Sequence, residues 1–199
     1  MVAVRINGEE ANLQCGASSR FTELVELVKS IIDPDHIITD ISIDGRDLSE
    51  GEWQGQINQF GTAIVEIKTG KVEDYVRERM AASSELVNDL YLMFRQARKF
   101  YQSGNSVEGN HTLGDAVRTA KAFFEWYSSM FQLVPVSERA SYNIEPQVVE
   151  IGDVCKKICQ QQLYQSWSAL GDTIEKELEP KLDKLETFCR RFQQSAKAA

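Results

Sequence analysis

The spacing of the apolar residues changes once along this 199-residue chain, close to residue 70. Before that point apolar and polar residues alternate in short runs, as they do in strands with one buried face. After it, apolar residues recur every three or four positions, as they do on the buried face of a helix. The sequence therefore predicts an α+β chain of two domains, with residues 1–70 in the first and residues 71–199 in the second.

Strand and turn signals follow one another through the first domain. Apolar residues alternate on both sides of Asn7-Gly8, a dipeptide that supplies the two positive φ angles of a tight hairpin turn. A helix with one apolar face is expected next, ending before Pro34. Further strands are expected over 37–43, after the turn at Asp44-Gly45, and over 63–67. The predicted order is two strands, a helix and three strands.

This order resembles the ubiquitin-like β-grasp superfold, and Val4-Arg5-Ile6-Asn7-Gly8-Glu9 is similar to the start of the thiamine and molybdopterin sulfur carriers. Those carriers work through a C-terminal Gly-Gly whose carboxylate is adenylated and thiolated. Here the matching position, Thr69-Gly70-Lys71, is internal and has a single glycine. The resemblance therefore implies a β-grasp domain that binds other proteins or small ligands.

Four helices with short connections are expected in residues 71–199, which favours an antiparallel bundle. Their expected ranges are 72–103, 113–134, 146–170 and 172–192. Leu170-Gly171-Asp172 predicts a tight reversal, because Gly171 can end one helix and Asp172 can cap the next. Pro180 predicts a kink or a broken hydrogen-bond ladder in the last helix.

The second of these helices carries apolar residues on two faces. A heptad set follows one side: Leu113, Val117, Ala120, Phe124, Tyr127 and Phe131. A second stripe, which contains Phe123, Trp126 and Met130 with Ala116 and Val134, lies on the order of 100° or more away. Either this helix is enclosed on both sides, or the stripe packs under the first domain, or Phe123, Trp126 and Met130 bind an amphipathic helix of a partner.

Trp53 and Phe60 lie in a loop rich in glycine and amide side chains. The two rings either close the edge of the first domain's core or form an exposed aromatic surface for recognition. They complete the predicted set of partner-binding residues.

Cysteines and acidic residues give no metal or cofactor site. Cys155 and Cys159 lie one helical turn apart and are expected to be buried thiols, with a metal or redox pair as the alternative. The two histidines, His36 and His111, lie in distant segments. An acidic cluster is expected to serve solubility, with a divalent-cation site as the alternative: Asp40, Asp44, Asp47, Glu50 and Glu52.

The charge is unevenly distributed. Residues 1–70 contain 5 Lys+Arg and 12 Asp+Glu, a net charge of −7 out of −8 for the whole chain. With no basic block to compensate, nucleic acid is not an expected partner. Without a long apolar run or a leader sequence, a membrane span is not expected either, and the chain is expected to be cytoplasmic.

The sequence carries none of the familiar catalytic patterns, such as a phosphate-binding loop or a nucleophile elbow. It predicts a noncatalytic adaptor or a chaperone-like protein that binds another protein, and it leaves the oligomeric state open. The segment Glu85–Tyr91 resembles bacterial flagellar export chaperones, which lack a β-grasp domain. The alternative is a small-ligand or sulfur-relay enzyme accessory in which Cys155 or Cys159 reacts.

Overall fold

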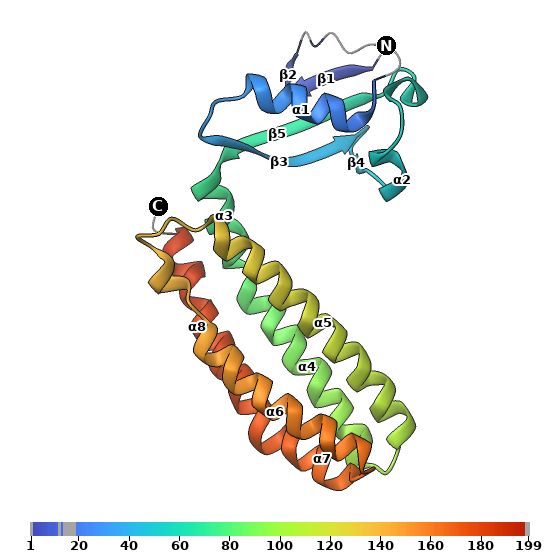
Figure 1. The fold of residues 1–199 in the computed structure, drawn as a ribbon, viewed down its shortest axis with the longest axis vertical. Helices are drawn as coiled ribbons and strands as arrows, with labels where there is room; N and C mark the ends of the chain where they lie inside the picture. Colours follow the sequence, from blue (N-terminus) through green and yellow to red (C-terminus); the bar gives the residue numbers. More distant parts are fainter. Residues whose placement is uncertain (1, 12, 14–18, 198–199) are drawn as a thin grey trace. The chain divides into compact units, whose positions relative to one another are not determined.

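A computed structural model describes residues 2–11, 13 and 19–197, with the side chains of 194–197 left aside. The chain is α+β and divides into two compact units, Met1–Tyr75 and Val76–Ala199 (Figure 1). The division lies five residues beyond the boundary expected from the sequence. Strand β5 (Ile64–Lys71) continues directly into helix α3 (Val72–Ala81), whose first turn belongs to the first unit.

The first unit is built on a five-stranded mixed sheet with the order β2-β1-β5-β3-β4. The strands besides β5 are β1 (Ala3–Ile6), β2 (Glu9–Glu10), β3 (His36–Ile43) and β4 (Arg46–Asp47). The central pair, β1 and β5, is parallel, and the other three pairs are antiparallel. Helix α1 (Phe21–Ile31), helix α2 (Glu50–Trp53) and a 3-10 turn (Ile57–Phe60) complete the unit.

Both hairpin turns predicted from the sequence are present. Asn7 and Gly8 have φ angles of 52° and 85°, and Asp44 and Gly45 have φ angles of 48° and 78°. These are the paired positive φ values of two-residue hairpin loops, which match the twist of the flanking strands. The side chain of Asn7 also bonds β5, since Thr69 N donates to Asn7 Oδ1 at 2.9 Å.

One apolar core fills the space between α1 and the sheet. Three residues of α1, spaced at steps of three and four, are fully buried: Phe21, Leu24 and Val28. They pack with Val4, Ile43, Ile57, Val65 and Ile67, which come from the strands and the 3-10 turn. The alternation seen in the sequence therefore places one face of the sheet against α1.

The second unit consists of long helices that lie side by side (Figure 1). They are α4 (Ser83–Gln102), α5 (Ser106–Leu133), α6 (Glu145–Leu163), α7 (Trp167–Thr173) and α8 (Glu179–Lys197). Helices α5, α7 and α8 pack against α4, and α6 packs against α7 and α8. The long helix expected over 72–103 is divided into α3 and α4 at Ala82.

The reversal predicted at Leu170-Gly171-Asp172 is wrong. The chain reverses at Tyr164-Gln165-Ser166 instead, and Gly171 lies inside α7. Gly171 is buried against α4, where a methyl group in its place would lie 3.6 Å from Cβ of Tyr101. The glycine allows two helices to approach closely, which sequence spacing alone does not distinguish from a helix end.

Pro180 is accommodated by a π-helical turn over Ile174–Leu178, which joins α7 to α8. In an α-helix the proline ring would clash with the carbonyl group four residues earlier. The wider turn avoids this, and the N–H of Glu179 donates to the carbonyl of Ile174, five residues back. The irregularity that Pro180 predicts in the hydrogen-bond ladder is therefore present, and it takes the form of a widened turn.

Candidate functional site

The candidate site is an apolar cleft of the second unit, between α5 and the start of α6. Its volume is about 250 Å³. Four residues of α5, two of the connection that follows it and two of α6 line it: Phe124, Tyr127, Ser128, Phe131, Asn143, Ile144, Glu145 and Val148. We call this space the α5–α6 cleft.

The cleft is held open by the way the helices pack. Helix α5 buries Leu113, Ala116, Phe123 and Tyr127, and its close packing is against α4. Helix α6 packs instead against α7, the π-helical turn and α8. The two helices that flank the cleft are thus fixed by different neighbours, which leaves space between them.

The connection between α5 and α6 forms the wall of the cleft and is firmly anchored. The hydroxyl of Tyr127 donates to the carbonyl of Tyr142 at 2.7 Å. The Tyr142 ring packs on Phe192 of α8, with ring centroids 4.7 Å apart. Nε of Arg139 donates to the carbonyl of Val134 at 3.1 Å. These contacts indicate a cleft that is formed before any ligand arrives.

A stripe of residues on α6 continues along the cleft. Val148, Gly152, Cys155, Cys159 and Gln162 follow at steps of four and three, so they share one face. Val148 lines the cleft, and Nε2 of Gln162 donates to Oδ1 of Asn110 on α5 at 2.9 Å. Both ends of the stripe therefore face α5, with small side chains between them.

The buried face of α5 takes residues from both sets: Leu113 and Tyr127 from the heptad set, and Ala116 and Phe123 from the second stripe. Val117 is 48% exposed, and Phe124 and Phe131 are half-buried in the cleft. Phe123 is only 5% exposed, and its ring lies 5.2 Å from that of Phe124. The two stripes predicted from the sequence thus share one buried face, and Phe123 lies within it.

The other predicted binding residues are partly covered. Trp126 and Met130 are half-buried, and partner binding by these two side chains stays a prediction. Trp53 and Phe60 both pack edge-on against Phe21 of α1, with centroids 5.4 Å and 6.0 Å away. Both rings thus contribute to the core of the first unit, and recognition by their loop also stays a prediction.

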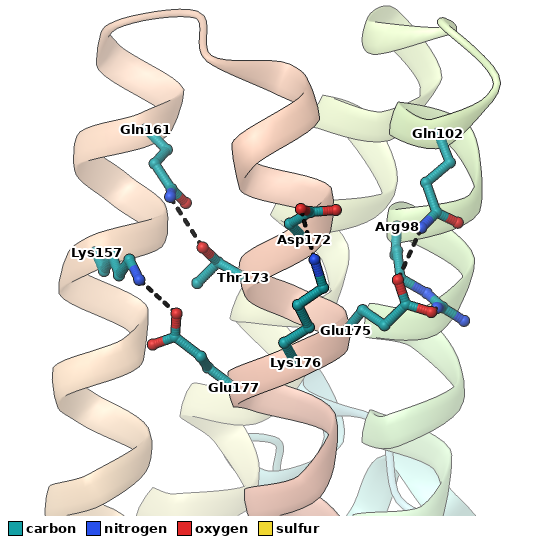
Figure 2. A network of polar contacts seen from close by, with 9 residues as sticks. All are labelled: Arg98, Gln102, Lys157, Gln161, Asp172, Thr173, Glu175, Lys176 and Glu177. Carbon is teal, nitrogen blue, oxygen red and sulfur yellow. Dashed lines mark hydrogen bonds and ion pairs between the residues drawn. The ribbon is translucent and has the colours of Figure 1, made fainter.

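A buried polar cluster joins α4 to the π-helical turn and was missed in the sequence (Figure 2). Arg98 is 8% exposed and forms ion pairs with Glu175 and Glu179. Nε of Arg98 lies 3.0 Å from Oε1 of Glu179 without the angle of a hydrogen bond, and Nε2 of Gln102 donates to Glu175 at 3.0 Å. Charged residues on helices are usually solvated, so the positions of Arg98, Glu175 and Glu179 in the sequence did not indicate a buried cluster.

The same view shows α6 tied to the π-helical turn and α7 (Figure 2). Nε2 of Gln161 donates to Oγ1 of Thr173 at 2.9 Å, and Lys157 forms an ion pair with Glu177. None of these side chains lines the α5–α6 cleft. The cluster therefore positions helices, because a buried ion pair with several partners fixes their register.

The cysteines differ in exposure. Cys159 is exposed, contrary to the predicted pair of buried thiols, and Cys155 is half-buried. Burial, together with the neighbouring Cys159, raises the pKa of Cys155 above its ordinary value. Burial raises the pKa of Cys189 on α8 to about 11. Cys15 lies outside the described residues.

The acidic residues of the predicted cluster have separate partners. Asp40 pairs with Lys68 at 3.0 Å, and Glu52 pairs with Arg46 at 2.6 Å. Oδ1 of Asp44 accepts a hydrogen bond from the backbone of Ile64. Within the described residues, potential metal ligands of three side chains meet at one place only, at Asp33, Asp35 and His36.

In the described part of the chain, none of the helices combines the length and the apolar character needed to cross a membrane. Comparisons with protein-family models, with curated proteins and with solved structures found no match to this chain.

Proposed function

We propose that the protein is a noncatalytic, cytoplasmic adaptor or chaperone-like protein that holds a helix of another protein in the α5–α6 cleft. The observation that carries this proposal is the cleft itself, an anchored groove with an aromatic lining. Amphipathic helices bind such grooves through apolar residues spaced three and four apart. On α6, the space around Gly152 is open, because a methyl group built there would meet nothing within 4 Å.

The polar groups of the cleft support binding rather than catalysis. The hydroxyl of Tyr127 already donates its hydrogen bond to a backbone carbonyl, and burial raises the pKa of this hydroxyl. Oδ1 of Asn143 accepts a hydrogen bond from the backbone N–H of Glu145 at 3.0 Å. Groups that hold the wall of the cleft in place are poorly suited to exchange protons with a substrate.

The proposed function includes a proposed fold for each unit. We assign the first unit to the β-grasp type, supported by its strand order, its central parallel pair and the packing of α1 on the sheet. We assign the second unit to the antiparallel helical bundles, supported by the three-residue connection Ser103-Gly104-Asn105 and the tight reversal at Gln165. Both assignments suit a binding protein.

The alternative function, a sulfur relay or small-ligand accessory, has one observation in its favour. Cys159 is exposed on the α6 stripe. The raised pKa of Cys155 counts against a reactive pair, because the thiolate is the nucleophile. One extra cysteine-bound sulfur atom, or one metal ion, per chain of the purified protein would favour this alternative if it is lost in Cys159→Ser.

Site-specific photo-crosslinking tests the helix-binding proposal. A benzophenone side chain is placed at Phe131 in the cleft and, as a control, at Leu92 on α4, which is 50% exposed. The cleft position should cross-link to an amphipathic helical segment of one protein, and the control position should not. Equal cross-linking from both positions would contradict the proposal.

Binding of the cross-linked protein is then measured with purified components. Phe131→Ala should weaken binding by about tenfold or more, since aromatic anchors supply much of the affinity of such interfaces. Leu92→Ala, an exposed apolar residue elsewhere in the unit, should leave affinity within about twofold. If both variants bind alike and melt like the wild type, the cleft is not the binding site.

A further inference from the structure

Strand β3 has a free edge along most of its length. On one side it pairs with β5 from His36 to Ile43. On the other side β4 reaches only Ser42 and Ile43. Among the described residues, the stretch His36–Ile41 therefore has no strand on its outer side. A strand edge of this kind presents backbone donors and acceptors that can pair with another chain.

The outward groups can be assigned from the pairing. The N–H of Asp44 donates to the carbonyl of Ile64 on β5 at 2.9 Å. Since bonding direction alternates along an antiparallel pair, Asp40 and Ser42 also direct their backbone groups to β5. Ile43 and Ile41 direct theirs to the opposite side, where Ile43 meets β4. The N–H and C=O of Ile41 thus belong to the free edge.

Little in the sequence of this edge discourages pairing. His36-Ile37-Ile38-Thr39-Asp40-Ile41 is rich in β-branched residues, which favour strands. Its one irregularity is a bulge between Ile38 and Asp40. The opposite edge strand, β2, has only two residues, Glu9 and Glu10, and is thus protected by its length and charge.

The charge around the free edge specifies the kind of partner. Between residues 33 and 47 the chain carries five aspartates and one arginine. Asp33 and Asp35, at the start of the edge, are exposed, and so is Asp47 beyond its other end. A complementary segment is basic at its ends, because opposite charges across an interface favour the encounter.

We propose that the free edge of β3 binds an extended segment of a partner protein as an additional strand, and that this segment carries β-branched residues flanked by lysine or arginine. Backbone hydrogen bonds to Ile37–Ile41 hold the segment, since the N–H of His36 already donates to the carbonyl of Asp33, and the aspartates select its basic ends. This inference does not depend on the α5–α6 cleft, since it concerns the other unit and a partner in extended rather than helical conformation.

The test uses the full chain and a synthetic peptide of alternating valine and threonine with two lysines at each end. Binding should shift the NMR signals of His36–Ile41 and slow hydrogen exchange of the Ile41 amide by about tenfold or more. A control peptide with proline at its centre should do neither, because proline lacks the N–H and disrupts the added strand.

Two charge variants provide a matched comparison. Asp33→Asn with Asp35→Asn should weaken peptide binding by about three- to tenfold at low salt, and Glu9→Gln with Glu10→Gln should change it by less than about twofold. Both pairs remove the same charge, at opposite edges of the sheet. Equal weakening by the two pairs would reduce the effect to overall charge and would overturn the proposal.

Three other outcomes also overturn it. The first is a set of shifts centred on β2 or on the α5–α6 cleft. The second is an unchanged Ile41 amide when the peptide is saturating. The third is protection of Ile41 that rises with protein concentration in the absence of peptide, which would mean that the edge pairs with a second copy of this chain.

Discussion

Two helix ends in the second unit have the same hydrogen bonds but different residues at the critical position. At the end of α4, the N–H of Asn105 donates to the carbonyl of Phe100 at 2.9 Å and that of Gly104 to Tyr101 at 3.1 Å. This is a Schellman motif, which needs a left-handed residue. Gly104 fills that position with a φ angle of 81°.

At the end of α6 the left-handed residue is a glutamine. The N–H of Ser166 donates to the carbonyl of Gln161 at 2.8 Å, and that of Gln165 to Gln162 at 3.0 Å. Gln165 has a φ angle of 52°. A side chain in this conformation costs about 1–2 kcal/mol, because Cβ lies too close to the following carbonyl oxygen.

Substitutions at the two positions should therefore have opposite effects. A methyl group on Gly104 would meet nothing within 4 Å. Gly104→Ala therefore changes only the backbone strain of the folded state and the conformational entropy of the unfolded chain. The left-handed cost of about 1–2 kcal/mol is partly offset by about 0.4–1 kcal/mol from a less flexible unfolded chain. The net loss is about 1 kcal/mol, and Gln165→Gly should gain a similar amount.

Thermal melts give the readout. For a unit of about 120 residues, the entropy of unfolding is about 0.25 kcal/mol/K, so 1 kcal/mol corresponds to about 4 °C. Gly104→Ala should lower Tm by that amount, and Gln165→Gly should raise it.

Gly152→Ala is the control, because it makes the same chemical change inside α6, where the added methyl group also meets nothing within 4 Å. It should raise Tm by up to about 4 °C, since alanine favours a helix over glycine by about 1 kcal/mol. A neutral Gly104→Ala, or a Gln165→Gly that melts earlier than the wild type, would refute the reasoning.

Three further measurements test side-chain environments. Cys159 should react rapidly with a maleimide in the native protein, whereas Cys189, buried and with its pKa raised to about 11, should react only on unfolding; mass spectrometry of the modified sites checks this. The pKa of Glu52 is lowered to about 2, first by the hydrogen bond from Arg46. Its contribution to stability is therefore complete above the ordinary pKa of 4.5 and is lost as the pH falls towards 2, which NMR titration of the carboxyl follows. Trp126→Ala should lower the free energy of unfolding by about 2 kcal/mol in urea titrations, less than a fully buried ring would.

Each of these has a clear contrary result. Rapid native labelling of Cys189 would show that α8 opens readily, and a Glu52 midpoint near 4.5 would show that the pairing with Arg46 is absent in solution. A Trp126→Ala variant that is as stable as the wild type would place that ring on the surface, as the partner-binding prediction requires.

Local signals in the sequence were sufficient for the hairpin turns and the long strands of the first unit. The two turns at Asn7-Gly8 and Asp44-Gly45 follow from positive φ angles that few residues other than Gly, Asn and Asp adopt readily. The strand at 37–43 follows from alternation and β-branched residues. These rules act within a few residues, so one sequence is enough to apply them.

The helical unit shows where local rules fail. Gly171 was expected to end a helix, but it lies inside one because Tyr101, far away in the sequence, packs against it. Gln165 gave no signal of a turn, since glutamine rarely adopts a left-handed conformation. At Gly171 a tertiary contact decides the local structure, and at Gln165 the hydrogen bonds of the helix end form in spite of the residue type.

The candidate site was found only in part for the same reason. The sequence shows two apolar faces on α5 but not which face meets α4. Tyr127 of the heptad set and Phe123 of the second stripe are both buried, whereas Phe131 and Trp126, one from each set, are half-buried. Period and composition are similar for the two sets, so only the packing shows which residues of each are covered.

The parallel pairing of β1 with β5 has a consequence for the order of events during synthesis. Ala3 pairs with Ile64 and Ile6 with Ile67, so β1 finds its central neighbour only after some sixty more residues have been added. Contacts between such distant positions slow folding, because a long loop must close first. While the ribosome adds those residues, Val4 has no sheet neighbour on its β5 side, and β1 can pair only with the short strand β2. The sheet can close only once Lys71 has left the exit tunnel, when the residues of α3 have already been added behind it.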